Sequence, residues 1–128
     1  MLPFSVQFRP GQPVYEQVIY AVHKALVTGQ LQPGDPFPSV RQLSSELQIN
    51  PNTAHKIVTL LKQDKLIVVE PGRGTFINRD HRPDAEGRTA LLSEKVEALV
   101  VEALKLDLRR EDVVRAVETT WDSLSENN

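Results

Sequence analysis

The pattern of apolar positions predicts an amphipathic helix near the start of the chain. Apolar residues recur every three or four positions, at Tyr15, Val18, Ile19, Val22 and Leu26. Pro13 precedes this run and suits the first turn of a helix, and Gly29 follows where a helix is expected to stop. The pattern therefore predicts a first helix between Pro13 and Gly29.

Two further helices follow within a short stretch. The second is predicted to begin at Ser39, because Ser39 to Gln42 fits a capping box. Its apolar residues share one face and are Val40, Leu43 and Leu47. Asn50 is a natural N-cap for the third helix, and Pro51 stands at the first helical position, where its missing N–H is harmless.

The third helix is amphipathic. Its predicted buried stripe consists of Ala54, Ile57, Val58 and Leu61. The polar residues that fall opposite this stripe are Asn52, Lys56, Thr59 and Gln63. After this helix, the apolar segment from Leu66 to Glu70, the turn Pro71-Gly72-Arg73-Gly74 and the segment Thr75-Phe76-Ile77 predict a β-hairpin.

A polar stretch then divides the chain. Residues 79–88 are poor in apolar side chains and contain Pro83, Gly87 and charges of both signs, which is typical of a linker. We expect a first domain over residues 1–80, a linker over 81–88 and a tail over 89–128. Two tail helices are predicted from apolar residues at helical spacing, namely Leu92, Val96, Leu99, Ala103 and Leu106, then Val113, Val114, Val117, Trp121 and Leu124.

The tail offers too little surface for a core of its own, so we expect its apolar faces to pack against a second copy of the chain. The candidate dimerisation residues are Leu92, Val96, Leu99, Leu106, Val117 and Trp121. The start of the last helix is unusual, since Arg109 stands where a Ser or Asp cap is expected. Glu111 and Asp112 then restore a favourable charge near the helix N-terminus.

Composition narrows the class of protein. The 128 residues suffice for one domain with an appendage, and the absence of cysteine excludes disulfides and thiol chemistry. The first residues do not resemble a signal peptide, so we expect a cytoplasmic protein without a membrane partner. The net charge of −2 conceals an asymmetry. Up to Arg82 there are nine Lys and Arg against six Asp and Glu, a balance of +3, and beyond it six against eleven, a balance of −5.

These elements predict an α+β, mainly helical fold in which three helices and a hairpin form a winged helix-turn-helix, followed by a two-helix tail. In a helix-turn-helix, the second member enters the major groove of DNA. Asn52, Thr53 and His55 lie in its first turns and can both donate and accept hydrogen bonds. Asn52 is the best candidate for reading a base, because asparagine pairs bidentately with adenine.

Cations flank this helix. Lys56 adds a positive charge to it, and Arg41, near the start of the second helix, is placed to donate to phosphate or to reach a guanine. Glycines on both sides of Arg73 allow the wing to approach DNA closely, with the guanidinium in a minor groove or along phosphates. The candidate DNA-binding residues are Arg41, Asn52, Thr53, His55, Lys56, Gly72, Arg73 and Thr75.

Four ordered blocks resemble the GntR family of bacterial regulators: residues 29–35 (GQLQPGD), 38–43 (PSVRQL), 50–53 (NPNT) and 72–76 (GRGTF). The short tail and the third block resemble the YtrA subfamily. This resemblance implies a winged-helix dimer on a palindromic operator, with DNA contacts at Arg41, Asn52, Thr53, His55, Gly72 and Arg73. It also implies a repressor that acts on its own operon, commonly one for an ABC transporter.

The chain departs from the family at two positions. Many members have arginine where this chain has Pro51 and His55, so the operator sequence does not carry over. Two other functions are also compatible with the pattern: a helical interaction module whose winged domain is vestigial, and a sensor with a small-molecule effector in a dimer cleft or tail pocket.

We expect no enzyme activity, no metal and no cofactor. The carboxylates of the tail lack a Gly-rich loop or buried partner that would tune them for catalysis, and they are interpreted as solvated. The three histidines, His23, His55 and His81, are too scattered for a metal site.

Overall fold

The computed structural model describes residues 1–80 and 84–126. The chain forms two compact units that divide between residues 81 and 82. We call residues 1–80 the winged-helix unit and residues 84–126 the tail unit. Positions 81–83 of the predicted linker and the last two positions of the predicted tail lie outside the described residues.

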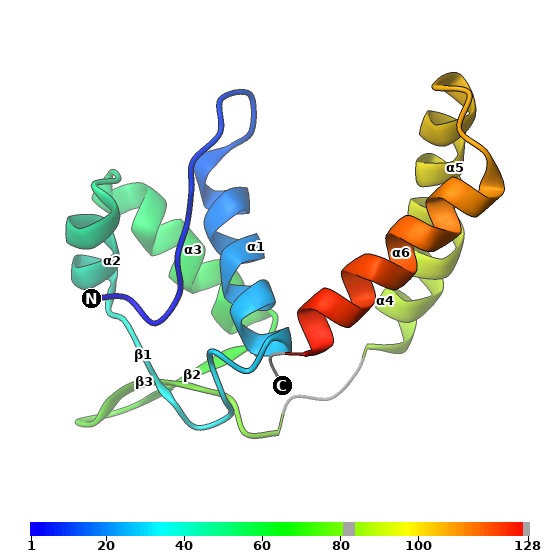
Figure 1. Cartoon of the computed structure of the whole chain (residues 1–128). Coiled ribbons are helices and arrows are strands. Elements are labelled where there is room, and N and C mark those ends of the chain that lie inside the picture. Colours follow the sequence, from blue (N-terminus) through cyan, green and yellow to red (C-terminus); the bar gives the residue numbers. More distant parts are fainter. Residues whose placement is uncertain (81–83, 127–128) are drawn as a thin grey trace. The chain divides into compact units, whose positions relative to one another are not determined.

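The winged-helix unit contains the three helices that the apolar spacing predicts. They are α1 (Val14–Val27), α2 (Val40–Leu47) and α3 (Pro51–Gln63). Both α1 and α2 pack against α3 (Figure 1). The predicted stripe of α3 is confirmed, because Ala54, Ile57, Val58 and Leu61 are its buried residues.

The ends of α2 and α3 are fixed by local hydrogen bonds. Ser39 Oγ accepts a hydrogen bond from the backbone N–H of Gln42 at 3.1 Å. Asn50 Oδ1 accepts one from the backbone N–H of Asn52 at 2.8 Å, and Pro51 opens α3 as predicted. Between the helices, Gln48 takes the left-handed conformation with φ of 53°. This residue turns the chain so that α3 leaves α2 at an angle.

A small antiparallel sheet completes the unit. The predicted hairpin is confirmed as β2 (Ile67–Glu70) and β3 (Gly74–Ile77), and β1 (Pro36–Phe37) pairs with the other edge of β3. The sequence analysis did not predict β1. The two residues of β1 are followed by Pro38 and are too few to show a periodic pattern. They form a strand only because β3 offers a free edge.

The core of the winged-helix unit joins helices, strands and the N-terminal segment. Phe4 and Phe37 stack with ring centroids 6.1 Å apart, so the segment before α1 is anchored against β1. The largest fully buried side chains are Leu31, Leu43, Ile57, Leu61, Ile67, Val18 and Val22. Ile57 and Leu61 belong to α3, and their burial in this core fixes which face of α3 remains exposed.

The tail unit is helical throughout most of its length. It contains α4 (Ala85–Ala90), a turn of π-helix η1 (Leu91–Lys95), α5 (Val96–Lys105) and α6 (Arg110–Ser125). Residues 85–88, assigned to the linker from the sequence, are therefore helical. Asp84 Oδ1 accepts a hydrogen bond from the backbone N–H of Glu86 at 3.1 Å, and this cap starts a helix without any buried residue.

The start of α6 compensates for its unusual cap residue. Asp112 Oδ2 accepts a hydrogen bond from the backbone N–H of Arg109 at 2.9 Å. The carboxylate also lies 3.8 Å from the Arg109 guanidinium Nε. Asp112 thus offsets the missing Ser or Asp cap and places a negative charge near the positive end of the helix.

Candidate nucleic-acid interface

The first two turns of α3 present a polar surface. Asn52, His55 and Lys56 are exposed, and Thr53 is half-buried. Ala54 lies among them in sequence but points into the core. The structure therefore groups the four candidate residues of α3 outside the core, where the helix could approach another molecule.

Lys56 has a neighbour that the sequence analysis missed. Its Nζ lies 3.8 Å from the centroid of the Tyr15 ring, an arrangement in which the ring attracts the ammonium. Tyr15 belongs to the first turn of α1 and its hydroxyl donates to Glu16 Oε1 at 3.4 Å. The only sequence signal was the position of Tyr15 on the apolar face of α1, which does not predict a contact with α3.

Arg41 lies in the first turn of α2 and is exposed. Glu46, also in α2, is not its partner, because the Glu46 carboxylate lies 2.7 Å from the amino group of Met1. A hydrogen bond from that amino group, and a second from Gln42, lower the pKa of Glu46. Among the described residues no ion pair of Arg41 is found, so its guanidinium is available for another anion.

The wing turn positions Arg73 at the tip of the hairpin. Gly72 and Gly74 have φ values of 79° and 121°, a backbone conformation that residues with a Cβ rarely adopt. Arg73 is exposed but does not extend freely into solvent, because its Nη1 lies 2.9 Å from Glu70 Oε2. Thr75 follows in β3, where it is half-buried and pairs with Val69 on one side.

The helix and the wing belong to the same unit. β2 packs against α3, and β2 also pairs with β3 along the whole hairpin. In Figure 1 the hairpin extends beyond the three helices on one side of the unit. The fold therefore holds a polar helix face and a projecting cation-bearing turn on a common framework.

Within the described ranges no group of three or more His, Cys, Asp or Glu side chains is arranged to hold a metal ion. Across the same ranges, no helix combines the length and the apolar character needed to cross a membrane. The site is built from amide, hydroxyl, imidazole and cationic groups, which together suit hydrogen bonding and anion binding.

The tail unit carries a second surface of different character. Ala103 is its one buried apolar residue within the part that the structure describes. All six candidate dimerisation residues are exposed, from 41% for Val96 to 73% for Leu92. We define the tail face as these residues: Leu92, Val96, Leu99, Leu106, Val117 and Trp121.

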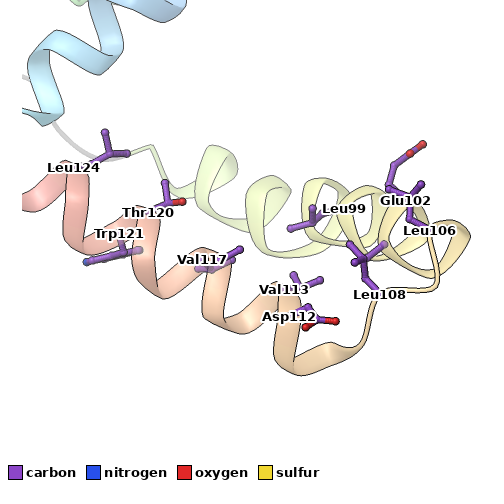
Figure 2. Close-up of a pocket in the computed structure, with 12 residues that line it drawn as sticks. Leu99, Glu102, Leu106, Leu108, Asp112, Val113, Val117, Thr120, Trp121 and Leu124 are labelled. Atoms are coloured by element: carbon purple, nitrogen blue, oxygen red, sulfur yellow. The ribbon is translucent and has the colours of Figure 1, made fainter.

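Much of the tail face lines an open groove between α5 and α6. The groove has a volume of about 470 Å³, and Leu99, Leu106, Val117 and Trp121 are among its lining residues. Figure 2 shows Leu99 from α5 and Val113 and Val117 from α6 pointing into the space between the two helices. Covering apolar side chains of this kind with another surface is favourable, because it removes them from water.

The three helices, the polar first turns of α3 and the projecting hairpin define a winged helix-turn-helix protein. Residues 14–77 match the family of bacterial regulatory proteins known as the gntR family. The chain belongs to this family. It is a YtrA-like transcriptional regulator, which is a class of DNA-binding proteins rather than of enzymes.

Two curated relatives come from Bacillus subtilis (strain 168). The transcriptional repressor YtrA is 33% identical over 96 residues, which cover 74% of each chain. The uncharacterized regulator YhcF is 29% identical over 113 residues, which cover 88% of this chain and 93% of that protein. Both matches extend beyond the winged-helix unit in length, so they include part of the tail.

Solved structures show the same fold. A GntR family transcriptional regulator from Listeria monocytogenes is 27% identical, covers 88% of this chain and 98% of its own, and has a TM-score of 0.68. A protein described as a transcriptional antiterminator from Listeria monocytogenes EGD-e has a TM-score of 0.82 at 24% identity, over 95% of this chain and 92% of its own. The second likeness concerns the fold alone.

Proposed function

We propose that this chain binds a palindromic DNA operator as a homodimer, with α3 of each copy in a major groove. The observation that carries the proposal is the exposed polar surface of the first two turns of α3. The Asn50 cap and Pro51 fix where this helix begins, and its buried stripe fixes which side faces outward. A major groove admits an α-helix whose N-terminal residues reach the base edges.

The residues of α3 take different parts in this proposal. Asn52 reads a base, because its exposed amide can donate and accept at the same time. Thr53 and His55 contribute further hydrogen bonds to bases or phosphates. Lys56 supplies a charge next to phosphate, and the Tyr15 ring beneath its ammonium restricts where that charge lies.

Residues outside α3 hold the DNA backbone. Arg41 lies at the positive end of α2 without an ion pair among the described residues, which favours a phosphate contact. At the wing, Gly72 allows the backbone to approach closely, and Arg73 reaches phosphates or a minor groove. Thr75 supports the wing from the central strand β3.

The homodimer is proposed from the tail face. Among its described residues the tail unit buries one apolar side chain, Ala103, and leaves the tail face exposed. Such a unit has little core of its own, so we infer that another protein surface covers the tail face. The charge balance of −5 beyond residue 82 argues against DNA as the cover. A second copy presents the same face, and a two-fold dimer also matches the symmetry of a palindrome.

We further propose that the protein is a cytoplasmic repressor of its own operon or of a transporter operon. YtrA of Bacillus subtilis, which shares 33% identity with this chain, is a repressor by name. A small-molecule effector would have room in the α5–α6 groove, but the homodimer makes a second copy the proposed occupant of that groove. DNA from upstream of the chain's own gene is the natural first ligand to try.

The salt dependence of DNA binding tests the proposal. Each phosphate contact releases counterions and contributes about −0.9 to the slope of log affinity against log salt. If Arg41, Lys56 and Arg73 of both copies contact phosphate, the slope is expected to be about −5. Fluorescence anisotropy with a labelled duplex between low and high salt measures it. An affinity that does not change with salt would contradict DNA binding.

A matched pair of variants locates the contacts. Arg73→Ala is expected to weaken binding to all sequences alike and to reduce the magnitude of the slope by about 1 for each copy that contacts phosphate. Arg115→Ala removes the same charge from the exposed surface of α6 and should leave the slope unchanged. Equal changes for both variants would mean that only net charge matters.

A further inference from the structure

The wing turn brings a carboxylate and a guanidinium together by its backbone geometry. The backbone N–H of Arg73 donates to the carbonyl oxygen of Glu70 at 2.9 Å, which closes a four-residue turn. Pro71 and Gly72 occupy the two central positions. The φ of 79° at Gly72 is the positive value that a type II turn requires there, and proline is common at the position before it. Glu70 and Arg73 therefore stand at the two ends of one turn.

Their side chains complete the contact. Glu70 Oε2 lies 2.9 Å from Arg73 Nη1, and the guanidinium carbon lies 5.5 Å from the centroid of the Phe76 ring. Arg73 thus contacts a carboxylate and also lies near an aromatic ring. The Arg73 side chain is 72% exposed and the Glu70 side chain 43%, so water and ions screen the attraction between them. Replacing the Glu70 carboxylate by another anion at Arg73 therefore costs little free energy.

We propose that Glu70 is an intramolecular competitor of DNA for Arg73 and thereby sets how strongly the wing binds any duplex. The inference rests on the proposed function, in which Arg73 contacts the DNA backbone. A phosphate that takes the guanidinium must displace the carboxylate. The displaced carboxylate then stays close to the wing tip, where it repels the phosphates and draws in a cation.

The competition explains an otherwise unfavourable feature of the wing. An acidic residue three positions before the cation reduces the affinity of that cation for DNA. It also limits the affinity that Arg73 contributes to binding unrelated DNA sequences, because any DNA must displace Glu70 from the guanidinium. Binding then depends more on α3, which reads bases, than on the wing, which does not.

The substitution Glu70→Gln tests this role, since it keeps the side-chain shape and removes the charge. We expect binding to a random-sequence duplex to become about two- to tenfold tighter at low salt, with a smaller gain at high salt because the lost interaction is screened. The slope of log affinity against log salt should become steeper, because no carboxylate is left to recapture a cation.

A double-mutant cycle separates competition from general repulsion. If Glu70 acts through Arg73, Glu70→Gln should increase DNA affinity clearly less when Arg73→Ala is already present. Glu118→Gln makes the same change in net charge at an exposed position of α6 and should not increase DNA affinity. An equal gain with and without Arg73, or no gain at all, would overturn the proposal.

The outcome is distinguishable from failure of the proposed function. If the unaltered chain binds DNA with a steep salt dependence and Glu70→Gln changes nothing, only the role of Glu70 is wrong. If the unaltered chain shows no salt-dependent binding, both are wrong. Circular dichroism spectra and unfolding temperatures of the variants should match those of the unaltered chain, since the pair is exposed.

Discussion

Replacing Trp121 with aspartate is expected to separate the homodimer into single chains and to weaken operator binding by about 100-fold or more. Trp121 is 71% exposed in the single chain although it lines the α5–α6 groove. Its indole therefore contributes little to folding of one copy and much to contact between copies. This difference makes it a sharper target than a buried residue of the tail.

The size of the effect follows from symmetry. An aromatic anchor at the centre of an interface commonly contributes about 2 kcal/mol or more, and a two-fold interface loses it twice. A loss of about 4 kcal/mol raises the dimer dissociation constant by roughly 1,000-fold. Once the copies separate, the second half-site is no longer bound intramolecularly, which removes the gain from bivalency.

Sedimentation velocity and operator titrations measure the two effects. Ser123→Asp is the matched control, because it adds the same charge to an exposed position two residues further along α6. It should leave both mass and affinity unchanged. If Trp121→Asp retained the mass of a dimer, the tail face would not be the interface. If the dimer dissociated while operator affinity stayed the same, dimerisation would not be needed for binding.

The substitution Asn52→Ala is expected to relax sequence preference and to cost about 1 to 3 kcal/mol at each cognate half-site, a loss of roughly 5- to 150-fold. The change is structurally mild. The hydrogen bond from Asn52 to the Asn50 cap uses its backbone N–H, which alanine retains. Alanine also favours the helix more than asparagine does, so α3 should stay folded.

Binding of both cognate and random duplexes must be measured. We expect Asn52→Ala to weaken the cognate complex strongly and the random-sequence complex little. Gln63→Ala, at the other end of α3, should affect neither. Equal losses on every sequence would show that Asn52 holds the backbone and does not read bases.

Much of the winged-helix unit could be predicted because its signals are local. The caps at Ser39 and Asn50, the proline at position 51 and the apolar stripe of α3 each depend on residues within one or two helical turns. The Pro71-Gly72 turn likewise fixes the hairpin by its own backbone preferences. Local agreement of this kind places the polar surface of α3 on the outside.

What could not be predicted depends on contacts between distant segments. The strand β1 exists because β3 offers an edge, and Lys56 lies over Tyr15 because α1 packs against α3. Neither relation leaves a periodic pattern in the sequence. The helix α4 was missed for another reason, since a capped, solvent-exposed helix needs no apolar stripe and resembles a linker in composition.

The most direct test of operator binding is selection from a pool of random duplexes with the purified full chain, followed by sequencing of the bound DNA. We expect the pool to converge on an inverted repeat whose half-sites lie about 10 base pairs apart or a multiple of that distance. Enrichment of a single half-site without symmetry, or no enrichment over the starting pool, would contradict binding of a palindromic operator by a homodimer.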